Sequence, residues 1–310
     1  MPNKHFGNLA DVFKHLVLAE TLGTLGPGEY WESHAGRAVN EEADEIPLER
    51  AHGIHAFWRL AQGSGVLRQS HYVRALRQSQ ATVPTAEAAP LKRIAGSALI
   101  ARRIWGRAAR RFLLCDTDAA SLLNIRQELP AAAGAGGGEL APDTLECVAE
   151  DGISVLRGAG ILLPAEWTAS VLAFLDPYDL EAPSDAGISA LQLACELANR
   201  EIKVLLFYTF DDPDQRRQRQ EALRRELTKA RLAGPKGGAG QWFEGSLRAT
   251  PEGQRGPTQW GFGLLGLHLP PPALTAIGER LRALETAYAN VELAPGTSGA
   301  WRYAHGTPPG

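Results

Sequence analysis

The sequence predicts an α/β protein with a doubly wound, mostly parallel sheet and a small helical insertion. Short apolar strands alternate with helices along most of the chain, and several of these strands end on an acidic residue. Strand–helix–strand units of this kind make right-handed crossovers, which place their strands parallel to one another. With 310 residues, of which 44% are hydrophobic, the chain has enough material for a packed core.

The expected elements divide the chain into a core and one insertion. Residues 1–41 and 91–310 are expected to form the α/β core, and residues 42–90 an inserted helical subdomain. Glycine-rich stretches at 131–139 and 234–240 are expected connections. Apolar periodicity predicts, in order, a helix at 8–25, a strand at 29–32, helical patches at 54–60 and 66–76, a helix at 91–105, a strand at 111–116, a helix at 119–129, strands at 145–149 and 170–175, a helix at 184–199, and strands at 203–208 and 261–269.

Composition excludes several classes of protein. The net charge of −3 gives no global basic field that would attract nucleic acid or an anionic membrane. Cys115, Cys147 and Cys195 are scattered and odd in number, which argues against disulfides and zinc and fits a reducing cytoplasm. The histidines have no metal-ligand spacing, so no metal is expected. Neither a signal peptide nor an apolar run of roughly 18 residues is found, so no membrane is expected and the predicted location is cytoplasmic.

A basic stretch and a group of aromatic residues have structural interpretations. The arginine-rich residues 216–231 lie on an expected helix where glutamates interleave, which favours a solvated or partner-facing helix over an RNA-binding face. Trp242, Trp260 and Phe262 flank glycine-rich turns and are interpreted as core or subunit-interface residues.

Acidic residues follow several consecutive strands of the expected sheet. They are Glu32, Asp116, Asp151 and Asp176, each at or just after a carboxyl end. Ligands of open parallel sheets bind outside these ends, where carboxylates can accept ribose hydroxyls or hold an amine. The alternative for Asp116 or Asp151 alone is a helix cap. Their recurrence in register favours a binding edge.

Short motifs along nearly the whole chain carry a family resemblance. They are the run from His5 to His15 (HFGNLADVFKH), Ser33-His34-Ala35-Gly36, the segment from Gly96 to Arg102 (GSALIAR), Asp151-Gly152, and Gly296-Thr297 with Trp301. On these motifs the chain resembles the bacterial methyltransferases that use S-adenosylmethionine (SAM) to methylate N6 of an adenine in large-subunit (23S) ribosomal RNA.

The resemblance implies a Rossmann-like class I SAM-methyltransferase fold and SAM as the cofactor. It also assigns roles to residues by their place in the motifs. Gly7, Asn8 and Lys14 would close the pocket, Ser33, His34 and Gly36 would wrap the methionine end of SAM, Gly96 and Ser97 would lie along the pocket, Asp116 would grip the ribose, Asp151 would contact the adenine, and Asp176 would face the nucleophilic amine.

The chain departs from the family's pattern at two places. The amine-methylating motif of the family is Asp-Pro-Pro-Tyr, whose tyrosine stacks on the flipped base. Here it reads Asp176-Pro177-Tyr178-Asp179, so Tyr178 takes the second proline's place and Asp179 the stacking place. In the SAM loop, Arg37 and Ala38 stand where the family has Ala-Gly, which is expected to put a β-carbon where the backbone approaches the cofactor.

These departures lead to three hypotheses. The first is a diverged enzyme in bacterial specialised metabolism that alkylates or cyclises the amine of a small molecule by SN2 displacement, with carboxylate assistance and with or without SAM; closure to an azabicycle is one instance. Its candidate catalytic residues are Asp176, Tyr178, Asp179 and Lys14. The second is a SAM-dependent adenine-N6 methyltransferase on ribosomal RNA. The third is a non-catalytic scaffold for a partner protein subunit.

Overall fold

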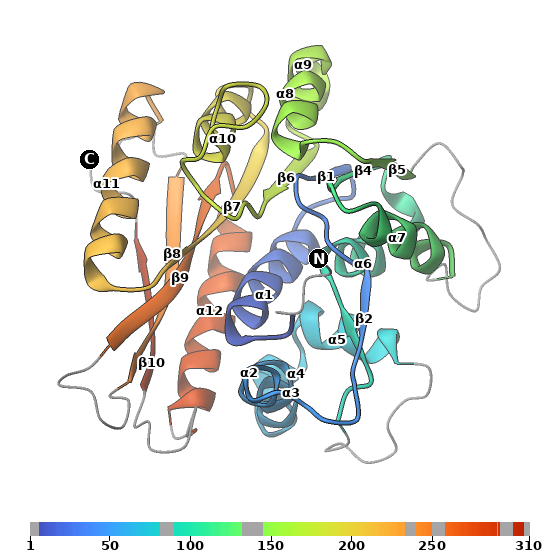
Figure 1. Cartoon of the computed structure of the whole chain (residues 1–310), viewed down its shortest axis with the longest axis vertical. Helices are drawn as coiled ribbons and strands as arrows, with labels where there is room; N and C mark the ends of the chain where they lie inside the picture. Colours follow the sequence, from blue (N-terminus) through green and yellow to red (C-terminus); the bar gives the residue numbers. More distant parts are fainter. Residues whose placement is uncertain are drawn as a thin grey trace.

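A computed structural model gives the fold of the chain (Figure 1). It describes residues 6–80, 90–131, 145–232, 240–249, 258–289, 291 and 300–306. The expected connections at 131–139 and 234–240 lie outside these residues except for Ala131 and Gly240. Among the helices that are described, none is long and apolar enough to span a membrane.

Eight strands form one sheet in the order β10-β8-β9-β7-β6-β1-β4-β5. The five strands from β7 to β5 are parallel, while β9, β8 and β10 extend one side as antiparallel neighbours. This confirms an α/β protein with a largely parallel sheet. The strands are β1 (Glu29–Glu32), β4 (Arg111–Cys115), β5 (Leu145–Val148), β6 (Val171–Leu175), β7 (Lys203–Phe210), β8 (Gly240–Ala249), β9 (Thr258–Leu267) and β10 (Ala300–Gly306).

Helices cover both faces of the sheet. Side chains of β6 alternate between two apolar clusters, with Leu172 and Phe174 in one and Val171, Ala173 and Leu175 in the other. The first cluster includes α1 (Leu9–Thr24), α6 (Ser97–Trp105), α7 (Ala119–Ala131) and α12 (Pro271–Tyr288). The second includes α8 (Gly152–Leu162), α10 (Ala190–Ala198) and α11 (Pro213–Lys229), and the short α9 (Ala165–Thr168) follows α8.

The insertion packs against α1 and α12 and shares their apolar cluster. Figure 1 places its helices below α1. Two short antiparallel strands, β2 and β3, join at its base. The backbone N–H of Ile54 donates to the carbonyl of Gly7 at 2.8 Å, which ties the insertion to the start of α1. Its helices are α2 (Leu48–His52), α3 (Ile54–Gly63), α4 (Gly65–Arg68) and α5 (His71–Ser79), and the flanking strands are β2 (Val39–Glu41) and β3 (Arg93–Ala95).

Several sequence expectations need correction. The helix expected at 91–105 starts only at Ser97, because residues 93–95 pair with β2 and Gly96 donates its N–H to Ala38. The helix expected at 184–199 starts at Ala190, where Ser189 and Gln192 form a capping box. Trp242 lies in β8 and Phe262 in β9, and the buried Phe262 confirms a core residue.

Candidate functional site

The order of the sheet identifies a binding edge. Strand β1 lies between β4 and β6, and the chain winds outward from it in both directions. Ligands of doubly wound sheets bind at such a switch point, outside the carboxyl ends of the strands. The residues that follow β1, β4 and β6 there are 32–36, Asp116 and Asp176, and helix α1 adds Lys14.

A buried ammonium links α1 to the end of β6. The Nζ of Lys14 lies 2.7 Å from Asp11 Oδ1 and 2.7 Å from Asp176 Oδ2. All three side chains are less than 20% exposed, and the ammonium also lies 5.2 Å from the centre of the Phe207 ring. Burial alone would lower the pKa of Lys14, but Asp11 and Asp176 outweigh it and hold that pKa well above its usual value. Lys14 is therefore a cation in this corner.

The N-terminal motif acts locally as a helix start. Asn8 caps α1 by accepting the N–H of Asp11 at 2.9 Å, and Asp11 accepts the N–H of Gly7 at 2.6 Å. Gly7 has a φ of +72°, a conformation that favours glycine. Burial would raise the pKa of Asp11, but Lys14, His15 and the hydrogen bond from the Gly7 N–H lower it. The motif therefore aims Lys14, one turn further on, at Asp176.

The loop after β1 is held from two sides. Gly36 donates its N–H to Asp116 Oδ2 at 2.7 Å, and the hydroxyl of Ser33 lies 2.7 Å from His34 Nδ1. Burial lowers the pKa of His34, although Asp176, Asp116 and Asp151 oppose it. Gly36 has a φ of +57°, and a Cβ there would meet no atom within 4 Å. The loop therefore leaves space above Gly36.

The two substitutions in this loop have different surroundings. Ala38 is fully buried in the apolar core, and the side chain of Arg37 is exposed. The β-carbon of Ala38 therefore packs within the apolar core. The close approaches are made by Gly96 and Gly152, where a Cβ would lie 2.1 Å from the carbonyl oxygen of Arg37 and 2.0 Å from that of Ser33.

Asp116 and Asp151 bind the protein's own backbone. Besides Gly36, Asp116 accepts the N–H of Asp118 at 2.7 Å. Asp151 is the N-cap of α8 and accepts the N–H groups of Ile153 and Ser154 at 3.3 and 3.1 Å. For Asp151 the structure confirms the alternative interpretation, a helix cap. Each carboxylate keeps unused acceptor positions, because an ionised carboxylate has about four.

The structure does not bring Tyr178 and Asp179 to the Lys14–Asp176 pair. The Tyr178 residue is 96% exposed. Asp179 accepts the N–H of Glu181 at 3.0 Å and lies 3.5 Å from Arg219 of α11. Gly296 and Thr297 of the C-terminal motif lie outside the described residues, and Trp301 is described only as part of β10.

The sequence did not indicate Tyr30 as a member of this site, and it indicated Glu32 only as one of several acids at strand ends. The buried Tyr30 hydroxyl donates to Glu32 Oε2 at 3.0 Å beneath the corner. Burial raises the pKa of Glu32 well above its usual range, although hydrogen bonds from Ser97 and Tyr30 oppose this. The signal was available, because residues two apart on a strand share a face.

The basic helix α11 is neutralised by acids. Arg216 pairs with the buried Glu244 at 2.6 Å, while Arg219 and Arg225 pair with Glu181 at 3.3 and 3.0 Å. Across the described ranges, no three histidine, cysteine or acidic side chains are grouped to hold a metal.

Comparisons with known proteins give a fold and no function. No protein-family model matches the chain, and no curated protein matches it. Among solved structures the chain is similar to the crystal structure of protein LPL1258 from Legionella pneumophila strain Philadelphia 1, of the family-model DUF519. The TM-score is 0.65, the match covers 98% of both chains, and 18% of residues are identical. A similarity at this identity shows the shared fold alone.

Proposed function

We propose that the chain is an enzyme that alkylates an amine of a small molecule by SN2 displacement, in a cyclisation or between two molecules, at the Asp176 corner. The observation that carries this proposal is the buried Lys14 ammonium, 2.7 Å from both Asp11 and Asp176. The two carboxylates of the corner already bind one alkylammonium group, that of Lys14. A protonated substrate amine carries the same kind of group.

The charge of the corner favours a second cation. Among the described residues, Asp11 and Asp176 share the one ammonium of Lys14, and all three side chains are largely buried. Asp176 Oδ2 is used by Lys14, and Oδ1 makes no hydrogen bond within the described part of the chain. A substrate ammonium bound to Oδ1 would neutralise the corner.

The reaction follows from this placement. The substrate ammonium gives a proton to Asp176, and the nitrogen lone pair then attacks the electrophilic carbon. As the N–C bond forms, the bond from that carbon to the leaving group breaks, and the leaving group departs with the electron pair. Lys14 fixes the carboxylate, since a misplaced general base loses much of its effect. His34 and the exposed Arg37 lie in the loop after β1, and we propose that they bind an anionic leaving group.

The residues of the β1 loop fit SAM as one alkyl donor. A Cβ on Gly36 would meet no atom within 4 Å outside its chain neighbours, and Asp116 keeps acceptor positions for ribose hydroxyls. Ser33, His34, Gly96, Ser97 and Asp151 would complete the site, and bound SAM would supply an electrophilic methyl group. The strand order, with its reversal at β1, supports the class I methyltransferase version of the fold.

A second candidate is adenine-N6 methyl transfer on ribosomal RNA. The conformation of Gly36, where a Cβ would meet no atom outside its chain neighbours within 4 Å, and the unused acceptor positions of Asp116 favour it. The exposed Tyr178 and the acidic Asp179 argue against it, because neither forms a wall on which a base could stack. A non-catalytic scaffold ranks third, because it has no need of a buried Lys14–Asp176 pair.

Calorimetry separates these candidates. The protein is titrated with SAM, with S-adenosylhomocysteine and with a panel of primary alkylamines, alongside Asp176→Asn and the matched control Asp179→Asn. We expect saturable amine binding that is lost in Asp176→Asn and retained in Asp179→Asn. Micromolar binding of both SAM compounds would overturn a SAM-independent reaction. Amine binding that survives Asp176→Asn would overturn the proposed corner.

A further inference from the structure

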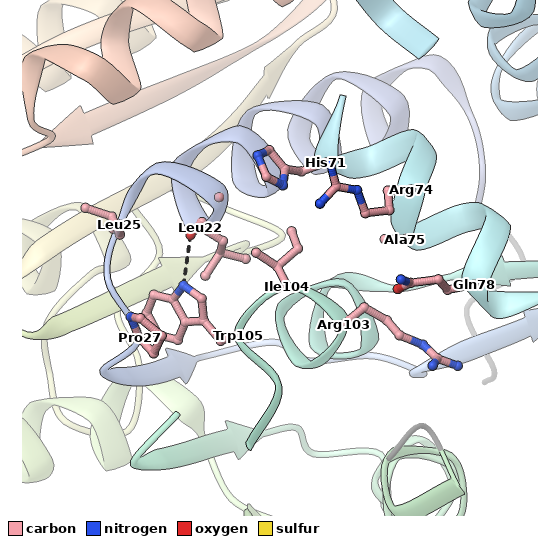
Figure 2. Close-up of a pocket in the computed structure, with 11 residues that line it drawn as sticks. Leu22, Leu25, Pro27, His71, Arg74, Ala75, Gln78, Arg103, Ile104 and Trp105 are labelled. Carbon is pink, nitrogen blue, oxygen red and sulfur yellow. Dashed lines mark hydrogen bonds between the residues drawn. The ribbon is translucent and has the colours of Figure 1, made fainter. Parts of the chain in front are cut away.

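Helix α1 is fixed at both ends, so the side chain of Lys14 is the part of the corner that needs further contacts to hold it. At the start of the helix, Asn8 accepts the N–H of Asp11 at 2.9 Å. At the other end, beside a cavity of about 270 Å³, the indole N–H of Trp105 donates to the Leu22 carbonyl at 2.9 Å (Figure 2). The helix backbone is therefore held. The position of the Lys14 ammonium depends on the groups that its long side chain contacts.

The ammonium of Lys14 has three N–H donors but only two carboxylate partners among the described residues. Asp11 Oδ1 and Asp176 Oδ2 each lie 2.7 Å from Nζ. The remaining contact is with Phe207, because Nζ lies over its ring, 5.2 Å from the ring centre. A cation within about 6 Å of an aromatic ring centre is attracted by the negative face of the ring. Phe207 is therefore the third partner of the ammonium.

The ring of Phe207 is itself held in place. It lies on β7 and is only 5% exposed, and its centre is 6.4 Å from that of Phe262 on the neighbouring strand β9. Phe262 in turn lies 5.0 Å from Phe13, which precedes Lys14 on α1. The three rings belong to the apolar cluster that buries α1. The ring face under the ammonium is therefore preformed.

Core packing explains only part of this arrangement. An apolar side chain at position 207 fills space in the cluster whatever lies over it. Packing does not explain the ammonium, since the Lys14 side chain is only 14% exposed and a buried charge needs compensating contacts. Without its third partner, the ammonium would be drawn to another acceptor. Asp176 Oδ1, the oxygen assigned above to the substrate amine, belongs to a carboxylate that Lys14 already contacts.

We propose that Phe207 is a positioning residue of the Asp176 corner, whose ring holds the Lys14 ammonium on Oδ2 and thereby leaves Oδ1 open to the substrate amine. This role rests on the proposed function of the corner. It also fixes the part that Lys14 plays. An ammonium with two carboxylates and a ring face as partners stays protonated, so the proton of the substrate ammonium goes to Asp176 and Lys14 remains a fixed cation.

Fluorination of the ring tests this role. Fluorine withdraws charge from the ring face that attracts the cation, and it changes the volume of the ring little. Position 207 carries in turn phenylalanine and its mono-, tri- and pentafluorinated forms. Calorimetry with propylamine measures amine binding, and circular dichroism verifies the fold. We expect the affinity to fall stepwise with the number of fluorine atoms, by at least threefold in the pentafluorinated protein.

A matched control uses the same fluorinated series at Phe57. This ring is fully buried in the same apolar cluster, but it lies in the insertion and stacks on Tyr72. Propylamine binding should be unchanged across the control series.

Urea unfolding adds a readout that does not depend on amine binding. The urea midpoint of the unmodified protein should fall stepwise with fluorination at position 207. The same series in Lys14→Met, which has no ammonium over the ring, should show no such fall. Any effect of fluorine on packing is common to both backgrounds, so the difference between them measures the contact between Phe207 and Lys14.

The possible failures of this role and of the proposed function differ. Propylamine affinity that is equal across the series at position 207 would overturn the positioning role and leave the proposed function standing. Equal changes of the urea midpoint in both backgrounds would show that the ring acts by packing alone, which also overturns it. Absence of amine binding by the unmodified protein would overturn the proposed function and the positioning role together.

Discussion

Two sides of the same sheet edge use their acids differently. At the end of β6, Asp176 binds the ammonium of Lys14, which arrives from a distant helix. At the ends of β4 and β5, Asp116 and Asp151 bind backbone N–H groups of adjacent loops and helices. An acid that follows a strand is therefore not functional by position alone. Whether such an acid can bind a ligand depends on which groups of the protein its carboxylate oxygens already bind.

Replacement of Lys14 should have the largest effect. Lys14→Met leaves Asp11 and Asp176 buried without a cation, which we expect to lower the free energy of unfolding by about 3 kcal/mol at pH 7. Because the pKa of Asp11 is lowered in the folded protein, its contribution is lost as pH falls, and the deficit should shrink in acid. Urea unfolding measures both. Lys229→Met, which removes an exposed lysine 3.7 Å from Glu226, should change stability by less than about 0.5 kcal/mol. A similarly small change for Lys14→Met would contradict the charge argument.

The pH dependence tests the same corner through His15. Burial lowers its pKa from 6.5 to about 4, against the pull of Asp11 and Asp176. Between these values the unfolded chain binds more protons, so the free energy of unfolding should rise with pH, by about 3 kcal/mol in total. Denaturation across pH 4 to 7 should give a flatter profile for His15→Gln. A profile unchanged from that of the unmodified protein, or equal flattening by the exposed His305→Gln, would contradict this assignment.

Loss of the α8 cap should have a moderate effect. Asp151→Ala removes the acceptor for two backbone N–H groups and should lower the free energy of unfolding by about 1 kcal/mol. Asp151→Ser retains a capping oxygen and should recover most of that stability. Amine binding should be unchanged in both variants. If both lose ligand binding while Ser restores stability, Asp151 contacts the ligand as well.

Asp179 should be the least sensitive position. The side chain is half exposed and its ion pair with Arg219 is long, at 3.5 Å. Asp179→Asn should therefore change the free energy of unfolding by less than about 0.5 kcal/mol. Amine binding should also be unaffected. A large loss of binding with unchanged stability would return Asp179 to the site.

Much of the fold and part of the site could be predicted from the sequence. Strands β4 and β6 are predictable because each is a short apolar run that an aspartate follows. Strands β8 and β10 could not be predicted, because glycines and polar residues interrupt them. They form only by pairing with other strands in the folded protein. The sequence indicates both Lys14 and Asp176 as candidate site residues. Their contact becomes visible only in the fold, because 162 residues separate them. The β3 strand was read as helix because its partner β2 lies more than 50 residues earlier.

The bond between Ile54 and Gly7 gives the insertion a second significance. Gly53 lies so close to Gly7 that a Cβ there would come within 2.2 Å of the Gly7 carbonyl. The insertion therefore fixes where α1 begins. It thereby also fixes the position of the Lys14 ammonium further along the helix. Loss of residues 42–90 would leave every acid of the sheet edge in place. It would remove the contact that sets where α1 begins and, with it, the position of the Lys14 ammonium.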